Sequence, residues 1–266
     1  MRIGVKPGQY GWTFDELVRS WRVAEEAEFD LLACFDHVSS SPGGGQAWDA
    51  PTSLAAMAGQ THRIALGVFV LNASLRHPFL LAGQLAVAQG VSGGRVEVGI
   101  GAGSYHFARY DHKALGLPFP DFAERITRLE TCCRVLPALW RGEEVTDEAT
   151  GLSRASLGAI GIAPPPVLVG GRSARALDIA VRHADGWHAP TMEPGEFADI
   201  ARKLDLACEE VGRPALTKSV QLPADDLASS KEEVERFSEA GASTVLFVLD
   251  AKRGPDWVRR LADEVL

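Results

Sequence analysis

Short runs rich in β-branched residues alternate with amphipathic stretches along the whole chain. Strands that are separated by helices must pair in parallel through right-handed crossovers, which leaves an open doubly wound sheet or a closed (β/α)8 barrel. Eight strand starts favour the barrel, and most of them lie roughly 20 to 30 residues apart, the length of one repeat. We expect the strands to begin near Met1, Asp30, Arg63, Arg95, Pro166, Asp185, Lys218 and Ser243.

The chain length agrees with one such barrel. A barrel of this kind typically has about 250 residues, and the chain has 266. We therefore expect a single domain over residues 1–266, with an insertion where the strand starts are farthest apart.

Three helix starts are marked by capping signals. Thr13 and Glu16 form a capping box before an amphipathic run. Asp49 is expected to cap a second helix, which has a proline in its first turn. Ser230 and Glu233 match another capping box and predict a helix that begins at this serine.

The insertion is expected between the fourth and fifth strands. Its extra material has two parts, a loop over residues 104–120 and a stretch with glycine and alanine over residues 143–164, which follows the long helix over residues 122–140. Long loops in compact domains usually serve a function. We therefore regard the insertion as a candidate lid over the mouth of the barrel.

Charge and apolar patterning restrict the partners. The formal net charge is −8, and no basic run offers a track for a nucleic-acid backbone, so neither nucleic acid nor an anionic membrane is expected. Lys6, Asp15 and Glu16 interrupt the N-terminal apolar stretch, and the longest apolar run, residues 64–71, is far shorter than the roughly 20 residues that cross a bilayer. The cysteines lack C-x-x-C spacing and the histidines lack H-x-H or H-E-x-x-H spacing. We therefore expect reduced thiols, no bound metal and a cytoplasmic protein.

In a (β/α)8 barrel, the chemistry lies on the loops that follow the strands. Asp36 and His37 directly follow the apolar run of residues 31–35. An imidazole at this place suits general acid-base work, because it exchanges protons near neutral pH. The alternative is an aspartate that ties the loop to backbone N–H groups, beside an idle histidine. His106 and His112 could meet His37 in space, although no spacing requires it.

Two glycine-rich turns also follow expected strands. Residues 99–103 fail the fingerprint G-x-G-x-x-G and precede an expected loop, so they indicate only that the backbone can approach a flat ring or an anion closely. Gly170, Gly171 and Arg172 precede a helix near Ser173, whose exposed N–H groups make a candidate phosphate site. The alternatives are a tight turn at a crowded strand end and a plain strand-to-helix turn capped by Ser173.

Taken in order, these motifs match one family over nearly the whole chain. They are Asp36-His37, residues 61–67 (THRIALG), His77-Pro78, residues 92–95 (SGGR) before residues 99–103, Arg125 with Leu129, residues 169–171 (VGG) and residues 184–187 (ADGW). The chain resembles the bacterial luciferase-like flavin monooxygenase superfamily, and within it the branch that uses the deazaflavin coenzyme F420.

The resemblance implies a barrel that holds a flavin or deazaflavin ring at its C-terminal mouth. A non-prolyl cis peptide bond that backs the ring would be Phe69–Val70. Asp36 would contact the cofactor, and His37 would lie near the reacting carbon and exchange a proton with the substrate. Asn72 would also bind the cofactor. Gly101, Gly103 and Ser104 would line the ring or its ribityl chain, and Gly170, Gly171 and Arg172 would lie at the phosphate.

The chain departs from this branch at two positions. Its sugar and alcohol dehydrogenases carry a carboxylate after the first strand, where this chain has Gln9 and Tyr10, and another after the glycine-rich turn, where it has Ser104. Three functions therefore stay open. The first is hydride transfer between the deazaflavin and a small organic substrate, the second is an FMN-dependent monooxygenase supplied by a flavin reductase, and the third is a non-catalytic cofactor-binding subunit. The resemblance also implies a homodimer.

Overall fold

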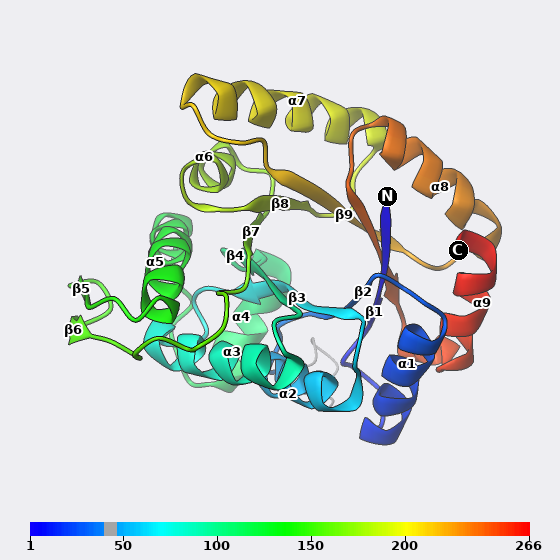
Figure 1. Ribbon diagram of the computed structural model, residues 1–266, viewed down its shortest axis with the longest axis horizontal. Helices are drawn as coiled ribbons and strands as arrows, with labels where there is room; N and C mark the ends of the chain where they lie inside the picture. Colours follow the sequence, from blue (N-terminus) through cyan, green and yellow to red (C-terminus); the bar gives the residue numbers. More distant parts are fainter. Residues whose placement is uncertain (40–46) are drawn as a thin grey trace.

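Eight parallel strands form a closed barrel in the computed structural model, which describes residues 1–39 and 47–266 (Figure 1). The barrel strands are β1 (Arg2–Pro7), β2 (Leu31–Cys34), β3 (Ala65–Asn72), β4 (Val96–Gly101), β7 (Val167–Gly170), β8 (Gly186–Ala189), β9 (Thr217–Pro223) and β10 (Thr244–Leu249). β1 closes the barrel because it pairs in parallel with both β2 and β10. Each strand begins within two residues of its predicted start, and the (β/α)8 architecture is confirmed.

Helices surround the strands on the outside of the barrel (Figure 1). They are α1 (Phe14–Glu26), α2 (Ala50–Gln60), α3 (Pro78–Ser92), α5 (Phe122–Trp140), α6 (Ala174–His183), α7 (Pro194–Glu210), α8 (Leu227–Glu239) and α9 (Asp256–Val265), with a short 3-10 helix η1 (Ala251–Arg253) before the last. Several are amphipathic; α1, for example, buries Leu17, Trp21 and Ala24 at helical spacing. No helix within the described ranges is long and apolar enough to span a membrane.

Two of the three predicted helix starts are confirmed. Thr13 and Glu16 form the capping box of α1, and Asp49 accepts a hydrogen bond from the backbone of the first turn of α2. The third prediction is wrong, because α8 begins at Leu227 and its cap is Asp226, which accepts from the N–H of Ala228 at 3.1 Å. Ser230 lies one turn inside that helix.

The insertion between the fourth and fifth barrel strands is also confirmed, but part of it was predicted wrongly. Residues 104–120, expected as a loop, contain the helix α4 (Tyr105–Ala114), which buries Ala108, Asp111 and His112 on one face. After α5 the chain forms an antiparallel hairpin, β5 (Val145–Asp147) with β6 (Leu152–Ala155), which projects beside α5 in Figure 1. α4 and the hairpin are thus two separate parts of the insertion.

Apolar side chains fill the barrel as well as the layer between strands and helices. The layer between strands and helices holds the larger cluster, and a smaller one inside the barrel consists of Leu31, Ala33, Phe69, Leu168 and Leu246. Both faces of most strands are therefore buried, as parallel sheets require. The barrel is a packed core, and a cavity opens toward the C-terminal ends of its strands.

Candidate active site

A cavity of about 930 Å³ opens at the C-terminal end of the barrel. Its lining comes from the ends of seven of the eight barrel strands and from the loops that follow them. Eight of the predicted site residues line it: His37, Phe69, Val70, Gly101, Gly103, Ser104, Gly170 and Gly171. Asp36, Asn72 and Arg172 do not line it. The hairpin β5–β6 contributes nothing to the described lining, whereas α4 contributes Phe107.

One wall of the cavity is a bulge in β3. The peptide bond Phe69–Val70 is cis, as the resemblance implied, and the pairing of β3 with β4 shifts register between Val68 and Leu71. Lys6 of β1 donates from Nζ to the carbonyl oxygen of Phe69 at 2.9 Å. The bulge is therefore tied to β1, the strand that lies beyond β2 in the barrel.

The side chain of Val70 explains why glycine occupies neighbouring strand ends. A Cβ atom at Gly101 would lie 2.8 Å from Val70 Cγ2, and one at Gly170 would lie 2.7 Å from Val70 Cγ1. Gly99 has the same restriction, at 2.9 Å. Contacts this short do not occur between carbon atoms in folded proteins, so these glycines make room for the bulge. This requirement exists before any ligand is considered.

Asn72 supports the turn after β4 from behind. Its Oδ1 accepts from the backbone N–H and the hydroxyl of Ser74, at 3.0 and 2.8 Å, and its amide packs against Gly103, where a Cβ would lie within 2.9 Å. Arg125 of α5 donates to the carbonyl oxygen of Gly103 at 2.5 Å. Gly103 has φ +78°, a conformation that glycine adopts most easily. These contacts fix residues 101–104, which border the cavity.

His37 is held by a residue that the sequence did not single out. Its Nδ1 hydrogen-bonds Oδ2 of Asp111 on α4 at 2.7 Å, and the other carboxylate oxygen accepts from the N–H groups of Val38 and Ser39 at 2.9 Å each. Asp111 is fully buried, whereas the side chain of His37 is 21% exposed. Because Nδ1 is engaged, Nε2 is the nitrogen of His37 that remains for a ligand.

Aromatic rings enclose His37 on the cavity side. The rings of Phe35, Phe107 and Tyr10 have their centroids 5.5, 5.7 and 5.8 Å from the imidazole, and Tyr10 stacks on it at 30°. Burial, together with the charges of the nearby Asp111 and Asp36, raises the pKa of Tyr10, so this phenol stays neutral. An apolar enclosure with one polar, oriented imidazole suits proton exchange with a bound organic molecule.

The other histidines named from the sequence do not meet His37. His112 lies on the same helix as Asp111, but its ring hydrogen-bonds Ser74 and the carbonyl oxygen of Pro118, each at 3.0 Å. His106 is exposed. The buried face of a short helix after a strand end was the available signal for Asp111, and it was missed because residues 104–120 were expected to be a loop.

Asp36 braces the loops behind the cavity. Its Oδ2 accepts from the N–H of Asn72 at 3.0 Å and from Arg76 at 2.6 Å, and Arg76 also pairs with Asp49, the cap of α2. Burial raises the pKa of Asp36, and the Arg76 guanidinium opposes that shift. The contacts of Asp36 agree with the structural alternative raised from the sequence, in which it ties the loop to backbone N–H groups.

Four side chains form the deep end of the cavity, and we call Lys6, Phe69, His188 and Gln221 the cavity floor. Lys6 donates to Gln221 Oε1 at 2.6 Å in addition to Phe69. His188 packs on the ring of Phe69, 4.9 Å between centroids, and its Nδ1 hydrogen-bonds the hydroxyl of Ser219 at 2.9 Å. None of the polar floor residues was among the predicted site residues.

The turn after β7 borders the cavity, and the N–H of Gly171 donates to the carbonyl oxygen of His188 at 3.2 Å. Gly171 has φ +126°, and its carbonyl oxygen accepts from the indole of Trp187 at 2.6 Å. Ser173 caps α6 by accepting from the N–H of Ala176. Arg172 is turned away, because it lies outside the cavity lining and pairs with Glu196 at 3.0 Å. The backbone of residues 170–171 borders the cavity, whereas the arginine does not.

A family model described as luciferase-like monooxygenase matches residues 1–244. Among curated proteins, an F420-dependent glucose-6-phosphate dehydrogenase of Beutenbergia cavernae is 33% identical over 191 residues, which are 70% of this chain and 56% of that protein. A protein of the same description from Kineococcus radiotolerans is 31% identical over 256 residues, 91% of this chain and 73% of the relative. The chain thus spans little more than half the length of the first of these relatives.

Solved structures share the fold at low sequence identity. A structure described as an F420-dependent secondary alcohol dehydrogenase in complex with an F420–acetone adduct superposes with a TM-score of 0.84. It is 16% identical, and the match covers 99% of this chain and 98% of that one. This likeness concerns the barrel, its closure and the order of its elements.

Proposed function

Because the chain belongs to the luciferase-like monooxygenase family, we propose that it is an oxidoreductase that uses the deazaflavin coenzyme F420. In this proposal a hydride moves between the coenzyme and a small organic substrate, and His37 supplies or removes the accompanying proton. The observation that carries the proposal is the oriented imidazole of His37 at the wall of the cavity, hydrogen-bonded to Asp111. The relatives named above support the choice of coenzyme.

The cavity fits a planar ring with a phosphate-bearing side chain. Its volume lies within the range of natural small-molecule sites. The floor offers a buried polar atom without a partner, His188 Nε2, and the backbone of Gly170 and Gly171 meets the cavity beside the start of α6. A helix start of this kind attracts phosphate. In the proposal, Val70, Gly101, Gly103 and Ser104 border the ring.

The protein's own share of the reaction is positioning, water exclusion and proton transfer. When bound, the deazaflavin supplies the hydride chemistry. Asp111 keeps His37 in one orientation, and the rings of Tyr10, Phe35 and Phe107 keep water from its exposed edge. We assign Asp36, Asn72 and Arg172 supporting roles, because their side chains contact residues around the cavity rather than the cavity itself.

The substrate of the relatives is not transferred to this chain. The outer part of the described lining carries the carboxylates of Asp225 and Asp250. The described lining as a whole includes one lysine or arginine side chain, Lys6, which lies on the floor. A sugar phosphate would meet carboxylates at the entrance. We therefore propose an uncharged alcohol or carbonyl compound as the substrate. We also propose that the protein is a homodimer and that it acts in the cytoplasm.

A titration with the two coenzymes tests the cofactor assignment. Purified protein is titrated with F420 and, separately, with FMN, and binding is followed by fluorescence quenching. We expect F420 to bind more tightly, and a panel of small alcohols and carbonyl compounds to change its absorbance with turnover. Tighter binding of reduced FMN with oxygen consumption would favour the monooxygenase instead, and F420 binding without turnover of any substrate would favour a cofactor-binding subunit.

Substitution of His37 tests its role. We expect His37→Ala to lower kcat by roughly a hundredfold or more, the size of a general acid-base contribution, with little change in the Kd of F420. His106→Ala is the matched control, because this histidine is exposed on α4 and forms no hydrogen bond in the described part of the chain. Unchanged turnover in His37→Ala would refute the assignment.

A further inference from the structure

Lys6 is a buried cation without a counter-charge. Its side chain belongs to the cavity floor and the residue is 3% exposed. Nζ contacts two neutral oxygens, the carbonyl oxygen of Phe69 and Oε1 of Gln221. Over residues 1–39 and 47–266, Lys6 forms no ion pair with a carboxylate, and the acidic group whose charge would raise its pKa is the Cys34 thiol. Two of its three N–H donors are used, and one remains.

Such a group is costly to bury, because the cation loses its hydration and gains two neutral acceptors and the ring of Phe35, whose centroid is 6.0 Å from Nζ. The same burial lowers the pKa of Lys6 to about 8. Burial likewise raises the pKa of Cys34, so this thiol stays neutral and does not compensate the lysine. A ligand with a negative oxygen at the floor would supply the missing charge.

His188 provides a second, independent observation at the same place. It is 3% exposed, its Nδ1 hydrogen-bonds the Ser219 hydroxyl, and its Nε2 has no partner. Burial, and then the charge of Lys6, lower the pKa of His188 to about 3, so the ring is neutral. A neutral imidazole carries one N–H, and in the tautomer with that proton on Nε2, Nδ1 accepts from the Ser219 hydroxyl and Nε2 faces the cavity as a donor. The floor then presents two donors to a ligand, one from each side chain.

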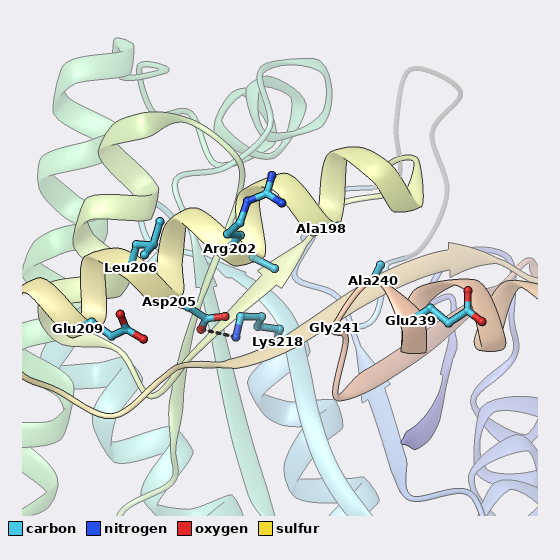
Figure 2. Close-up of a pocket in the computed structure, with 10 residues that line it drawn as sticks. Ala198, Arg202, Asp205, Leu206, Glu209, Lys218, Glu239, Ala240 and Gly241 are labelled. Atoms are coloured by element: carbon cyan, nitrogen blue, oxygen red, sulfur yellow. Dashed lines mark hydrogen bonds and ion pairs between the residues drawn. The ribbon is translucent and has the colours of Figure 1, made fainter.

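The other buried lysine in the described ranges has a carboxylate partner, as buried cations usually do. Lys218, near the start of β9, is 9% exposed and pairs with Asp205 of α7 at 2.7 Å. Figure 2 shows this pair between β9 and α7, and both residues line a surface pocket near the N-terminal end of β9. Lys218 has a carboxylate partner within the protein, whereas Lys6 faces a cavity.

We propose that Lys6 and His188 form an oxyanion subsite at the cavity floor, and that its occupant is the ionised ring hydroxyl of the deazaflavin. The assignment rests on the proposed function, because it deepens the choice of coenzyme. A deazaflavin of this kind carries an acidic hydroxyl on its ring, and FMN has none. The ammonium of Lys6 supplies the charge, and Nε2 of His188 supplies the second hydrogen bond. The subsite thereby selects the deazaflavin over FMN.

The test measures binding and ring ionisation rather than turnover. Wild-type protein, Lys6→Met and the matched control Lys218→Met are each titrated with oxidised F420 and with FMN. The absorbance of bound F420 is then recorded as a function of pH. We expect the wild type and Lys218→Met to lower the pKa of the bound ring hydroxyl by about one unit or more relative to free F420, since a nearby cation favours the ionised form.

Lys6→Met is expected to abolish this shift and to weaken F420 binding by roughly ten- to hundredfold, the value of a charge-assisted hydrogen bond. Its affinity for FMN should change less than about twofold. A ring-hydroxyl shift that persists in Lys6→Met, or an equal loss of FMN affinity, would overturn the subsite while leaving the proposed coenzyme intact. Failure of wild-type protein to bind F420 would instead overturn the proposed function.

A second variant keeps the subsite testable if Lys6→Met does not fold. His188→Phe retains an aromatic ring against Phe69 and removes Nε2. We expect a smaller ring-hydroxyl shift and several-fold weaker F420 binding, with FMN binding unchanged. Wild-type behaviour of His188→Phe would exclude His188 from the subsite and overturn the proposal as stated.

Discussion

Nδ1 of His37 and Oδ2 of Asp111 lie 2.7 Å apart, although 74 residues separate them in the chain. The second oxygen of Asp111 accepts the N–H groups of Val38 and Ser39, so one carboxylate fixes both the imidazole and the backbone that follows it. A buried carboxylate with this arrangement holds the imidazole in the tautomer with its proton on Nδ1. Nε2 then meets the cavity as the nitrogen able to accept a proton.

We expect Asp111→Asn to lower kcat roughly ten- to hundredfold, with KM and the Kd of F420 changed less than about twofold. The amide can donate to Nδ1 and thereby stabilise the opposite tautomer. Steady-state kinetics on the substrate found in the coenzyme assay provide the measurement.

A double substitution is the control for this prediction. His37→Asn combined with Asp111→Asn should be no slower than His37→Asn alone, because Asp111 acts through the imidazole. Multiplicative losses in the double variant would show that Asp111 acts independently of His37.

The strands were predicted and the pairing of Asp111 with His37 was not, for a physical reason. A strand in a parallel sheet is a local apolar run, so its position can be read from neighbouring residues. The polarity of α4 resembles that of a loop. The face of α4 that carries Asp111 becomes buried because it packs on residues that follow β2. A contact across 74 residues leaves no periodic signal. The same holds for the cavity floor, where Lys6 and His188 come from strands far apart in the sequence.

The glycines beside Val70 give a prediction about stability. A Cβ at Gly170 would lie 2.7 Å from Val70 Cγ1, so Gly170→Ala should destabilise the fold by about 1–3 kcal/mol, as overpacking does. The additional change Val70→Ala should restore most of the loss, because it removes the atoms that collide. Urea unfolding of the three proteins measures both effects.

Gly90→Ala is the matched control for that series. Gly90 lies in α3, and a Cβ there meets nothing within 4 Å. Alanine is the better helix former, so this change should stabilise the protein by up to about 1 kcal/mol. Equal destabilisation by Gly90→Ala and Gly170→Ala would mean that contact with Val70 is not the cause.

The start of α8 provides a further test, because sequence and structure place it differently. Asp226→Ala should cost about 1 kcal/mol, since it removes the cap that accepts from Ala228. Ser230→Ala should cost less than about 0.5 kcal/mol, because Ser230 is one turn inside the helix and alanine is well tolerated there. Urea unfolding of the two variants measures both losses of stability. A larger loss for Ser230→Ala than for Asp226→Ala would support a cap at Ser230. The pattern S-x-x-E occurs within helices as well as at their starts, so it cannot locate a start alone.

The last prediction concerns Lys6 and the pH dependence of stability without coenzyme. Burial lowers the pKa of this lysine from 10.5 to about 8. Between these values the unfolded chain binds the proton and the folded chain releases it, so the free energy of unfolding rises with pH over this window. The complete change would be about 3 kcal/mol.

The measurement compares wild type with Lys6→Met by urea unfolding at pH 7 and pH 10. Burial raises the pKa values of Cys34 and Tyr10, which lowers stability at high pH, but this contribution is common to both proteins and cancels in the difference. At pH 7 the methionine variant should be the more stable, because it lacks the uncompensated cation, and its advantage should shrink by pH 10. A variant that is less stable at both pH values by the same amount would instead mean that Lys6 serves only to tie Phe69 and Gln221 together.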